Sequence, residues 1–189
     1  PLGVITYRAD GYASTANTAA ARMIGTEVTR LLGQNFRQLE SWRHHGLLAA
    51  AEEALATGKE VVHRGPFVST FGRALWLEAR FVSFHFLGEE HLLVILNDET
   101  EPHRALENLN LLNAAVQASS SGWVITDAEG VIEFVNPGFT AMTGYTPAEA
   151  VGRKPSLLKS GRQNAAFYTA MWETIRRGEA WHGELETCR

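Results

Sequence analysis

Cysteine is almost absent from this sequence: among 189 residues, Cys188 is the single one. One cysteine excludes a disulfide framework and a cysteine-rich metal site within one chain, and it fits a reducing cytoplasm. No apolar run approaches the roughly 20 residues that span a bilayer, and the N-terminus lacks a signal-peptide pattern. The net charge of −4 provides no basic field for nucleic acid or an anionic membrane. We expect a cytoplasmic chain with no membrane span and no nucleic-acid partner.

Catalytic and metal-binding patterns are missing as well. No nucleophile, base and orienting group stand together as a motif, and there is no glycine-rich phosphate loop. The histidines form no ligand motif for zinc or haem. They are His44, His45, His63, His85, His91, His103 and His182. We therefore expect no metal site and no enzyme activity in this chain.

An internal repeat organises what is present. A shift of 119 positions, from Gly3 to Gly122, superimposes several glycines and their neighbours without gaps. Glycines mark positions where a turn or helix end needs positive φ, so this common spacing indicates the same turns twice. The pairs are Gly3 with Gly122, Ala9 with Ala128, Gly11 with Gly130, Asn17 with Asn136, Met23 with Met142, Gly25 with Gly144, and Gly33 with Gly152. We predict two copies of one fold.

The first copy, residues 1–100, changes its hydrophobic period twice. A β-rich stretch and the turn signal Asp10-Gly11 predict a hairpin. Short helices and a longer one over 46–57 follow, and the strand pattern returns at 60–64, 67–70, 74–86 and 91–96. In the long strand we expect one face to look inward, namely Leu75, Leu77, Ala79 and Phe81. Two strands, several helices and three strands predict an α+β domain, with helices on one face of a five-stranded antiparallel sheet.

The second copy, residues 121–189, repeats this order only in part. We predict strands at 122–126 and 131–135, short helices, a longer helix over 164–177, and a third strand over 181–187. Because the first copy has two more strands after this point, we expect the second domain to be truncated after its third strand. We also expect the chain to be a fragment of a longer protein.

Residues 101–120 connect the two copies. Asp98 and Thr100 follow the last strand of the first copy, and a helix start follows them. Apolar residues then recur at spacings of four, three and four, as in a coiled-coil seam. They are Ala105, Leu109, Leu112 and Val116. This helix could pack its stripe on its own domain, or it could form a parallel homodimer that connects two sensor units. Residues 119–121, three serines, look like a flexible linker.

The two copies resemble the PAS domain family. In the second copy the resemblance rests on Gly-Val-Ile-Glu-Phe-Val-Asn-Pro at 130–137, and on 143–145 and 151–152. Residues 97–100, the joint between the first copy and the connecting helix, contain Asp98-Glu99-Thr100. This run looks like the Asp-x-Thr signature that ends many PAS domains. The resemblance implies a dimeric sensory module that responds to a small ligand or to redox state and signals through Asp98 and Thr100. It also implies a downstream output domain in the same protein, either a histidine kinase of a two-component system or a cyclic-di-GMP enzyme.

A narrower similarity links the second copy to flavin-binding PAS domains of bacterial redox and aerotaxis sensors. It rests on Phe167, Met171-Trp172 and the Trp-His-Gly run at 181–183, and the sequence departs from it at 186–189. This similarity implies that Asn136, Trp172 and Trp181 contact FAD. The alternative is that both tryptophans are core aromatics in a ligand-free dimerisation scaffold. The long helix has no histidine, so the haem-binding pattern is not matched.

Overall fold

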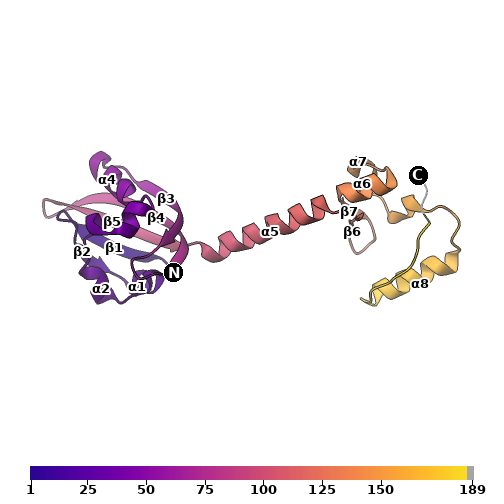
Figure 1. Ribbon diagram of the computed structural model, residues 1–189, viewed down its shortest axis with the longest axis horizontal. Helices are drawn as coiled ribbons and strands as arrows, with labels where there is room; N and C mark the ends of the chain where they lie inside the picture. The colour runs from indigo at the N-terminus through magenta and orange to yellow at the C-terminus, as the bar shows by residue number, and fades with distance from the viewer. Residues whose placement is uncertain (187–189) are drawn as a thin grey trace. The chain divides into compact units, whose positions relative to one another are not determined.

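A five-stranded antiparallel sheet dominates the N-terminal unit of the computed structural model, which describes residues 1–186 (Figure 1). Its strand order is β2-β1-β5-β4-β3. The strands are β1 Gly3–Arg8, β2 Ala13–Ala16, β3 Val61–Val68, β4 Ala74–Phe86 and β5 Glu89–Asp98. The chain divides into two compact units, Pro1–Glu107 and Asn108–Arg189, which are described separately.

Helices connect β2 to β3. They are α1 Thr18–Ile24, α2 Val28–Leu32, the 3-10 turn η1 Phe36–Gln38, α3 Glu40–His44 and α4 Leu47–Thr57. The caps of α1 follow from its sequence: the Asn17 side chain accepts a hydrogen bond from the Ala20 N–H, and Gly25 ends the helix in the left-handed conformation. The predicted α+β architecture is therefore confirmed for this unit.

The core of the first unit lies between one face of the sheet and these helices. The inward face predicted for β4 is confirmed, because all four of its residues are at most 6% exposed. They share one apolar cluster with buried residues of α1 and α4, such as Ala20 and Leu47. The inward-facing residues of β4 recur at every second position, and those of α4 about every 3.6 positions. Both sets thus belong to a single core.

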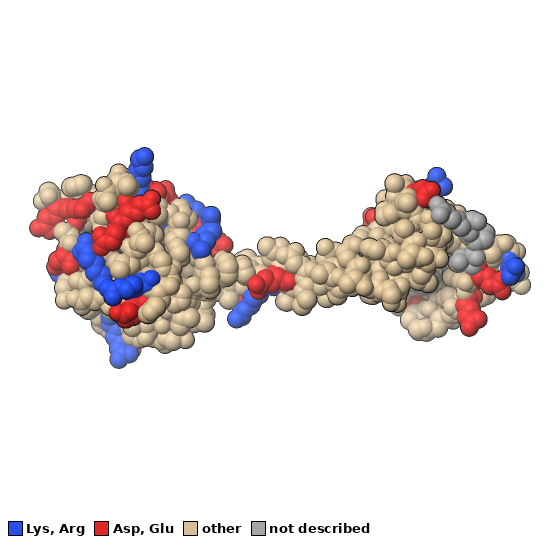
Figure 2. All heavy atoms as spheres, turned by 45° about the horizontal axis from the view of Figure 1, so that its top comes forward, with Lys and Arg blue, Asp and Glu red and all other residues tan. Residues whose placement is uncertain are grey.

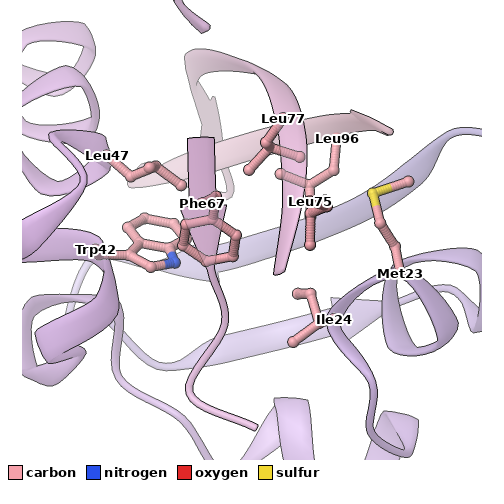
Figure 3. Close-up of a pocket in the computed structure, with 8 residues that line it drawn as sticks. All are labelled: Met23, Ile24, Trp42, Leu47, Phe67, Leu75, Leu77 and Leu96. Atoms are coloured by element: carbon pink, nitrogen blue, oxygen red, sulfur yellow. The ribbon is translucent and has the colours of Figure 1, made fainter. Parts of the chain in front are cut away.

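Four aromatic rings fill the centre of this core: Tyr7, Phe36, Trp42 and Phe81. Their paired centroids lie 5.3 to 5.8 Å apart, mostly edge to face. The adjoining cavity, lined by Trp42, Leu47, Phe67 and other apolar side chains, holds only about 10 Å³ (Figure 3). That is the space of about one water molecule, so this core as it stands is filled by its own side chains.

One boundary in the first unit differs from the prediction. The strands expected at 60–64 and 67–70 are a single strand, β3, which continues through Gly65 and Pro66. Proline cannot donate to a ladder, which made a break at this point the natural prediction. Because β3 is an edge strand of the sheet, a missing N–H is tolerated there.

The second unit repeats the first hairpin with the same register. Ile5 pairs with Ala16 in the first unit, and Val124 pairs with Val135, 119 positions later, in the second. Both hairpins carry a bulge at the equivalent place, between Thr6 and Tyr7 and between Ile125 and Thr126. The described elements are β6 Val124–Thr126, β7 Ile132–Val135, α6 Pro137–Thr143, α7 Pro147–Ala150, the 3-10 turn η2 Pro155–Leu158, and α8 Ala165–Arg176. The internal repeat is thus confirmed at the level of strand pairing.

The prediction of a third strand in the second unit is wrong for the described residues. Residues 181–186 form no strand, and 187–189, which include Cys188, lie outside the described residues. As far as residue 186, the sheet of this unit has two strands, β6 and β7, rather than five. In the first unit the equivalent strand, β3, exchanges its hydrogen bonds with β4, which follows it. A strand needs such a partner, and residues 181–186 pair with no strand within residues 1–186.

The connecting segment forms one helix, α5, over Thr100–Ala118, in agreement with the predicted helix start. Within residues 1–186, no helix is both long and apolar enough to cross a membrane.

Candidate functional site

The start of α5 is joined to the sheet by hydrogen bonds of Thr100. The last pair of the β4–β5 ladder is Leu77 with Asp98, so the backbone of Trp76 lies just beyond it. The Trp76 N–H donates to Thr100 Oγ1 at 2.9 Å, and the Trp76 carbonyl accepts from the Glu99 N–H at 2.9 Å. Asp98 Oδ1 accepts from the Thr100 hydroxyl at 2.5 Å and from its N–H at 3.0 Å. The two residues predicted to transmit a signal therefore lie in contact at the junction of strand and helix.

A ring stack extends this junction into the first turn of α5. The His103 imidazole lies parallel to the Trp76 indole, with centroids 3.5 Å apart and an interplanar angle of 16°. His103 Nδ1 also lies 3.6 Å from Glu107 Oε2, one turn further along the helix. Neither Trp76 nor His103 was predicted to belong to the joint. Their contact joins residues 27 positions apart, and helical or strand periodicity gives no signal for it.

Glu78 lies on the outer face of β4, beside the joint, yet its side chain is only 9% exposed. Arg64 covers it from β3, and Arg80 Nε donates to its other oxygen at 3.0 Å. These hydrogen bonds, first that of Arg64 and then that of Arg80, hold the pKa of the Glu78 carboxyl below its usual range. Arg80 also pairs with Glu60 at 3.3 Å, so the charges form a chain across β3 and β4.

The predicted dimer seam lies on a helix that buries none of its side chains. Leu109 and Leu112 are both 64% exposed, Ala105 is exposed, and Val116 is half-buried. Charged residues occur only in the first half of α5, and positions 108–126 contain no Asp, Glu, Lys or Arg. Figure 2 shows the same change along the helix, from red and blue side chains near its start to tan beyond them. Of the four predicted seam residues, Ala105, Leu109 and Leu112 are therefore exposed in the single chain.

Asn136, a predicted cofactor contact, is fully buried and bonded to backbone groups. Its Oδ1 accepts from the Trp123 N–H at 2.7 Å and from the Phe139 N–H at 3.0 Å, which makes it the N-cap of α6. Its Nδ2 donates to the carbonyls of Val116 at 2.9 Å and Ser121 at 3.0 Å. An amide side chain has two N–H donors and two lone pairs on its oxygen, so these contacts use its full capacity.

A cavity of about 830 Å³ lies in the second unit, between η2, the β6–β7 turn and α8. Trp172 lines it together with Tyr168 and Met171, and the Trp172 ring packs against Gly130. Trp181 instead stacks edge to face on Phe167, with centroids 5.5 Å apart. Among the described residues, the cavity lining includes Trp172 but neither Asn136 nor Trp181. The three predicted contacts are therefore not gathered around one space. The volume lies within the range of ligand pockets, and charged residues such as Lys154 and Asp127 stand at its border.

Ligand groups for a metal do not converge in the described residues 1–186: no three or more His, Cys, Asp or Glu side chains come together.

A family model for the PAS domain matches residues 1–101 and, again, residues 120–189. The chain belongs to the PAS domain family. It contains two PAS domains in tandem, with a five-stranded sheet in the first and, among the residues that the structure describes, a two-stranded sheet in the second. PAS domains are sensory modules, and this chain is accordingly a signal-sensing module.

Two curated proteins match about a third of this chain. The nitrogen fixation regulatory protein of Klebsiella pneumoniae is 34% identical over 70 residues, which cover 37% of this chain and 14% of the relative. The aerotaxis receptor of Escherichia coli (strain K12) is 30% identical over 64 residues, 34% of this chain and 13% of the relative. The match thus accounts for a small part of either relative.

Among solved structures, the chain is similar to the PAS domain of nitrogen regulation protein NR(II) from Vibrio parahaemolyticus. The identity is 21%, the coverage 51% of this chain and 88% of that one, and the TM-score 0.42. It is also similar to a PAS domain from Colwellia psychrerythraea, at 14% identity, 53% and 87% coverage, and a TM-score of 0.46.

The Glu78 cluster predicts a pH-dependent contribution to stability. Glu78→Gln places an amide N–H against the arginine donors, and we expect it to lower the free energy of unfolding by about 1 kcal/mol at neutral pH. Because the folded protein holds the pKa of Glu78 below its unfolded value, this stabilisation is complete above the ordinary glutamate pKa of about 4.3. It is lost as the pH falls through the lower pKa of the folded state. Urea unfolding of both proteins between pH 3 and 7 measures the difference.

Glu60→Gln is the matched control, because Glu60 pairs with Arg80 from a half-exposed position. We expect it to change the free energy of unfolding by less than about 0.5 kcal/mol. Equal effects of the two substitutions, or a Glu78 effect that grows as the pH falls, would contradict this assignment.

Proposed function

We propose that this tandem PAS chain senses a small ligand or a redox change and regulates an output domain of the same protein through a homodimer formed along α5. The output domain would be a histidine kinase or an enzyme of cyclic-di-GMP metabolism. The observation that carries the proposal is the joint, in which Thr100 and Asp98 link the end of the sheet directly to the first turn of α5.

Transmission in this proposal begins in the sheet. A change in the core of the first domain would shift β4 relative to β5, and Trp76 lies at the end of that ladder. Because Trp76 holds Thr100 by its N–H and His103 by its ring, such a shift would move the first turn of α5. The joint is then a two-state element whose position depends on both the sheet and the helix.

The seam supports a second copy of this chain as the partner. Four leucines of α5 are between 58 and 68% exposed, namely Leu106, Leu109, Leu111 and Leu112. An exposed helix with this apolar content and no charge after Glu107 is stabilised when an equivalent helix covers it. A parallel pair would place Leu109 and Leu112 of each chain against their counterparts.

A flavin in the second domain is a further candidate, favoured by the 830 Å³ cavity and by Trp172 on its wall. The names of two relatives, a nitrogen fixation regulatory protein and an aerotaxis receptor, agree with a redox role. For the first domain, the filled aromatic core favours the alternative of a ligand-free relay or dimerisation scaffold.

The joint generates a test in the full-length protein. Asp98→Ala and Thr100→Ala each remove the hydroxyl–carboxylate link, so we expect the change of output activity on stimulation to fall at least about fivefold. The output activity is measured with and without the stimulus. Asn110→Ala, on α5 but outside the joint and the seam, should leave the response intact. Unaltered regulation in both joint variants would remove this role from Asp98 and Thr100.

The seam generates a second test, by sedimentation equilibrium. Leu109→Asp places a charge in the centre of the proposed interface, where its desolvation should weaken dimerisation by roughly 100-fold. Leu111→Asp is the control, because Leu111 is equally exposed but lies outside the seam. A chain that is monomeric before substitution, or that is affected equally by both variants, would contradict the seam.

The flavin candidate is tested by absorbance of the purified full-length protein. A bound flavin gives a yellow preparation, and we expect Trp172→Ala to reduce the flavin content several-fold because Trp172 lines the cavity. Trp123→Ala is the matched control, since Trp123 is 47% exposed and outside the cavity lining. A colourless wild-type preparation that stays colourless after incubation with FAD would exclude this candidate.

A further inference from the structure

The C-terminal end of α5 has no glycine cap. The last carbonyls of a helix have no partner inside the helix, and a left-handed glycine commonly satisfies them. None of residues 115–122 has a positive φ, so α5 does not end in this way. The Val116 carbonyl accepts from the Ser119 N–H at 3.3 Å and from Asn136 Nδ2 at 2.9 Å. The same Nδ2 lies 3.0 Å from the Ser121 carbonyl oxygen and 3.4 Å from that of Ser119, in the linker that follows α5. The end of α5 is thus capped by a side chain 18 residues beyond Ala118.

The same side chain also organises the start of the second PAS domain. Its Oδ1 holds the N–H of Trp123 before β6 and the N–H of Phe139 in the first turn of α6. Asn136 therefore binds three segments at once: the end of α5, the entry to β6 and the start of α6. Asn136 is fully buried, so water cannot take the place of a hydrogen-bond partner that it loses.

Gly138 shows that the approach of the linker to α6 is close. A Cβ at this position would lie 2.4 Å from the Ser121 carbonyl oxygen and 2.7 Å from that of Ser119. Glycine is a poorer helix former than alanine, so its place in the first turn of α6 needs a reason. The contact supplies one, because only hydrogen fits between α6 and these carbonyls.

The first domain provides an internal comparison. Asn17, the equivalent of Asn136, caps α1 in the same way and holds the Val4 N–H at 3.1 Å and the Leu2 carbonyl at 3.0 Å. The position equivalent to Gly138 is Ala19. The cap is common to both domains, whereas the glycine occurs in the second domain alone.

We propose that Asn136 and Gly138 form a clamp that receives the C-terminal end of α5 and transmits its position to the β6–β7 hairpin and α6. This inference rests on the proposed role of α5 as a signalling helix and names the residues at its receiving end. A rotation or shift of the helix end moves three carbonyls that share one amide group. The hairpin and α6 must follow through Trp123 and Phe139, or the contacts must break. Asn136 is a positioning residue in this scheme.

Two substitutions distinguish the contact of Asn136 and Gly138 with the end of α5 from the role of Asn136 as N-cap of α6. Asn136→Ser keeps a good N-cap oxygen for α6 but removes the amide donors that hold Val116, Ser119 and Ser121. Gly138→Ala leaves Asn136 in place and favours the helix by propensity, but its methyl group displaces the two serine carbonyls. The matched controls are Asn17→Ser and Ala19→Gly at the equivalent positions of the first domain.

Amide hydrogen exchange of the whole chain, followed by mass spectrometry, measures the clamp directly. We expect exchange in residues 114–121 to become about tenfold faster in both clamp variants, while α8 stays protected. A purely local role predicts that Gly138→Ala protects α6 better and leaves 114–121 unchanged, which would overturn the proposal. The two controls should leave 114–121 at the wild-type rate, and acceleration by either of them would also overturn it.

The full-length protein separates failure of the clamp from failure of the proposed function. If wild-type output does not respond to any stimulus or to the Asp98→Ala substitution, the function assigned to α5 fails, whatever the exchange data show. If wild-type output responds and both clamp variants respond equally well, the clamp is rejected and the function stands. We expect both clamp variants to reduce the response at least about fivefold, with normal regulation in Asn17→Ser.

Discussion

The backbone of Trp76 sets the arrangement of everything around the joint. It lies one residue beyond the β4–β5 ladder, where its N–H and carbonyl have no partner in β5. Thr100 Oγ1 and the Glu99 N–H complete these two bonds, so the helix continues the hydrogen-bonding pattern of the sheet. Because half-buried backbone groups must be paired, the sheet end and the first turn of α5 are one structural body. The ring stack of His103 on Trp76 adds a contact between side chains at the same place.

The two PAS domains differ in how much empty space their interiors contain. In the first, the ring cluster around Trp42 occupies the space between sheet and helices and leaves about 10 Å³. In the second, α8 and η2 border a cavity of about 830 Å³. The first core is closed by a sheet of five strands, whereas the cavity of the second lies beside a sheet that has two strands over residues 1–186.

Much of this architecture could be predicted from the sequence, because repetition and periodicity report local geometry. The 119-residue repeat predicted two hairpins, and the structure gives them the same register and the same bulge. Alternation along β4 predicted its inward face. Contacts between side chains that are far apart in the sequence could not be predicted from these local patterns. The burial of Glu78 depends on Arg64 from a neighbouring strand, and the stack of His103 on Trp76 depends on where α5 begins. Asn136 was noted for its family position, yet its bonds to the end of α5 follow from the fold of the linker. The strand expected at 181–187 required a partner that no local pattern supplies.

In the homodimer proposed along α5, the uncharged stretch from residue 108 to residue 126 has a consequence for the selection of partners. Coiled-coil pairs commonly use charges beside the seam to accept one partner and reject another. A surface without charges offers no such discrimination, and its association is nearly independent of ionic strength. Helices of other sensors with the same apolar spacing could therefore pair with α5 equally well. Fidelity among related proteins in one cell must then come from the folded domains at either end of the helix, or from synthesis of both copies at one place.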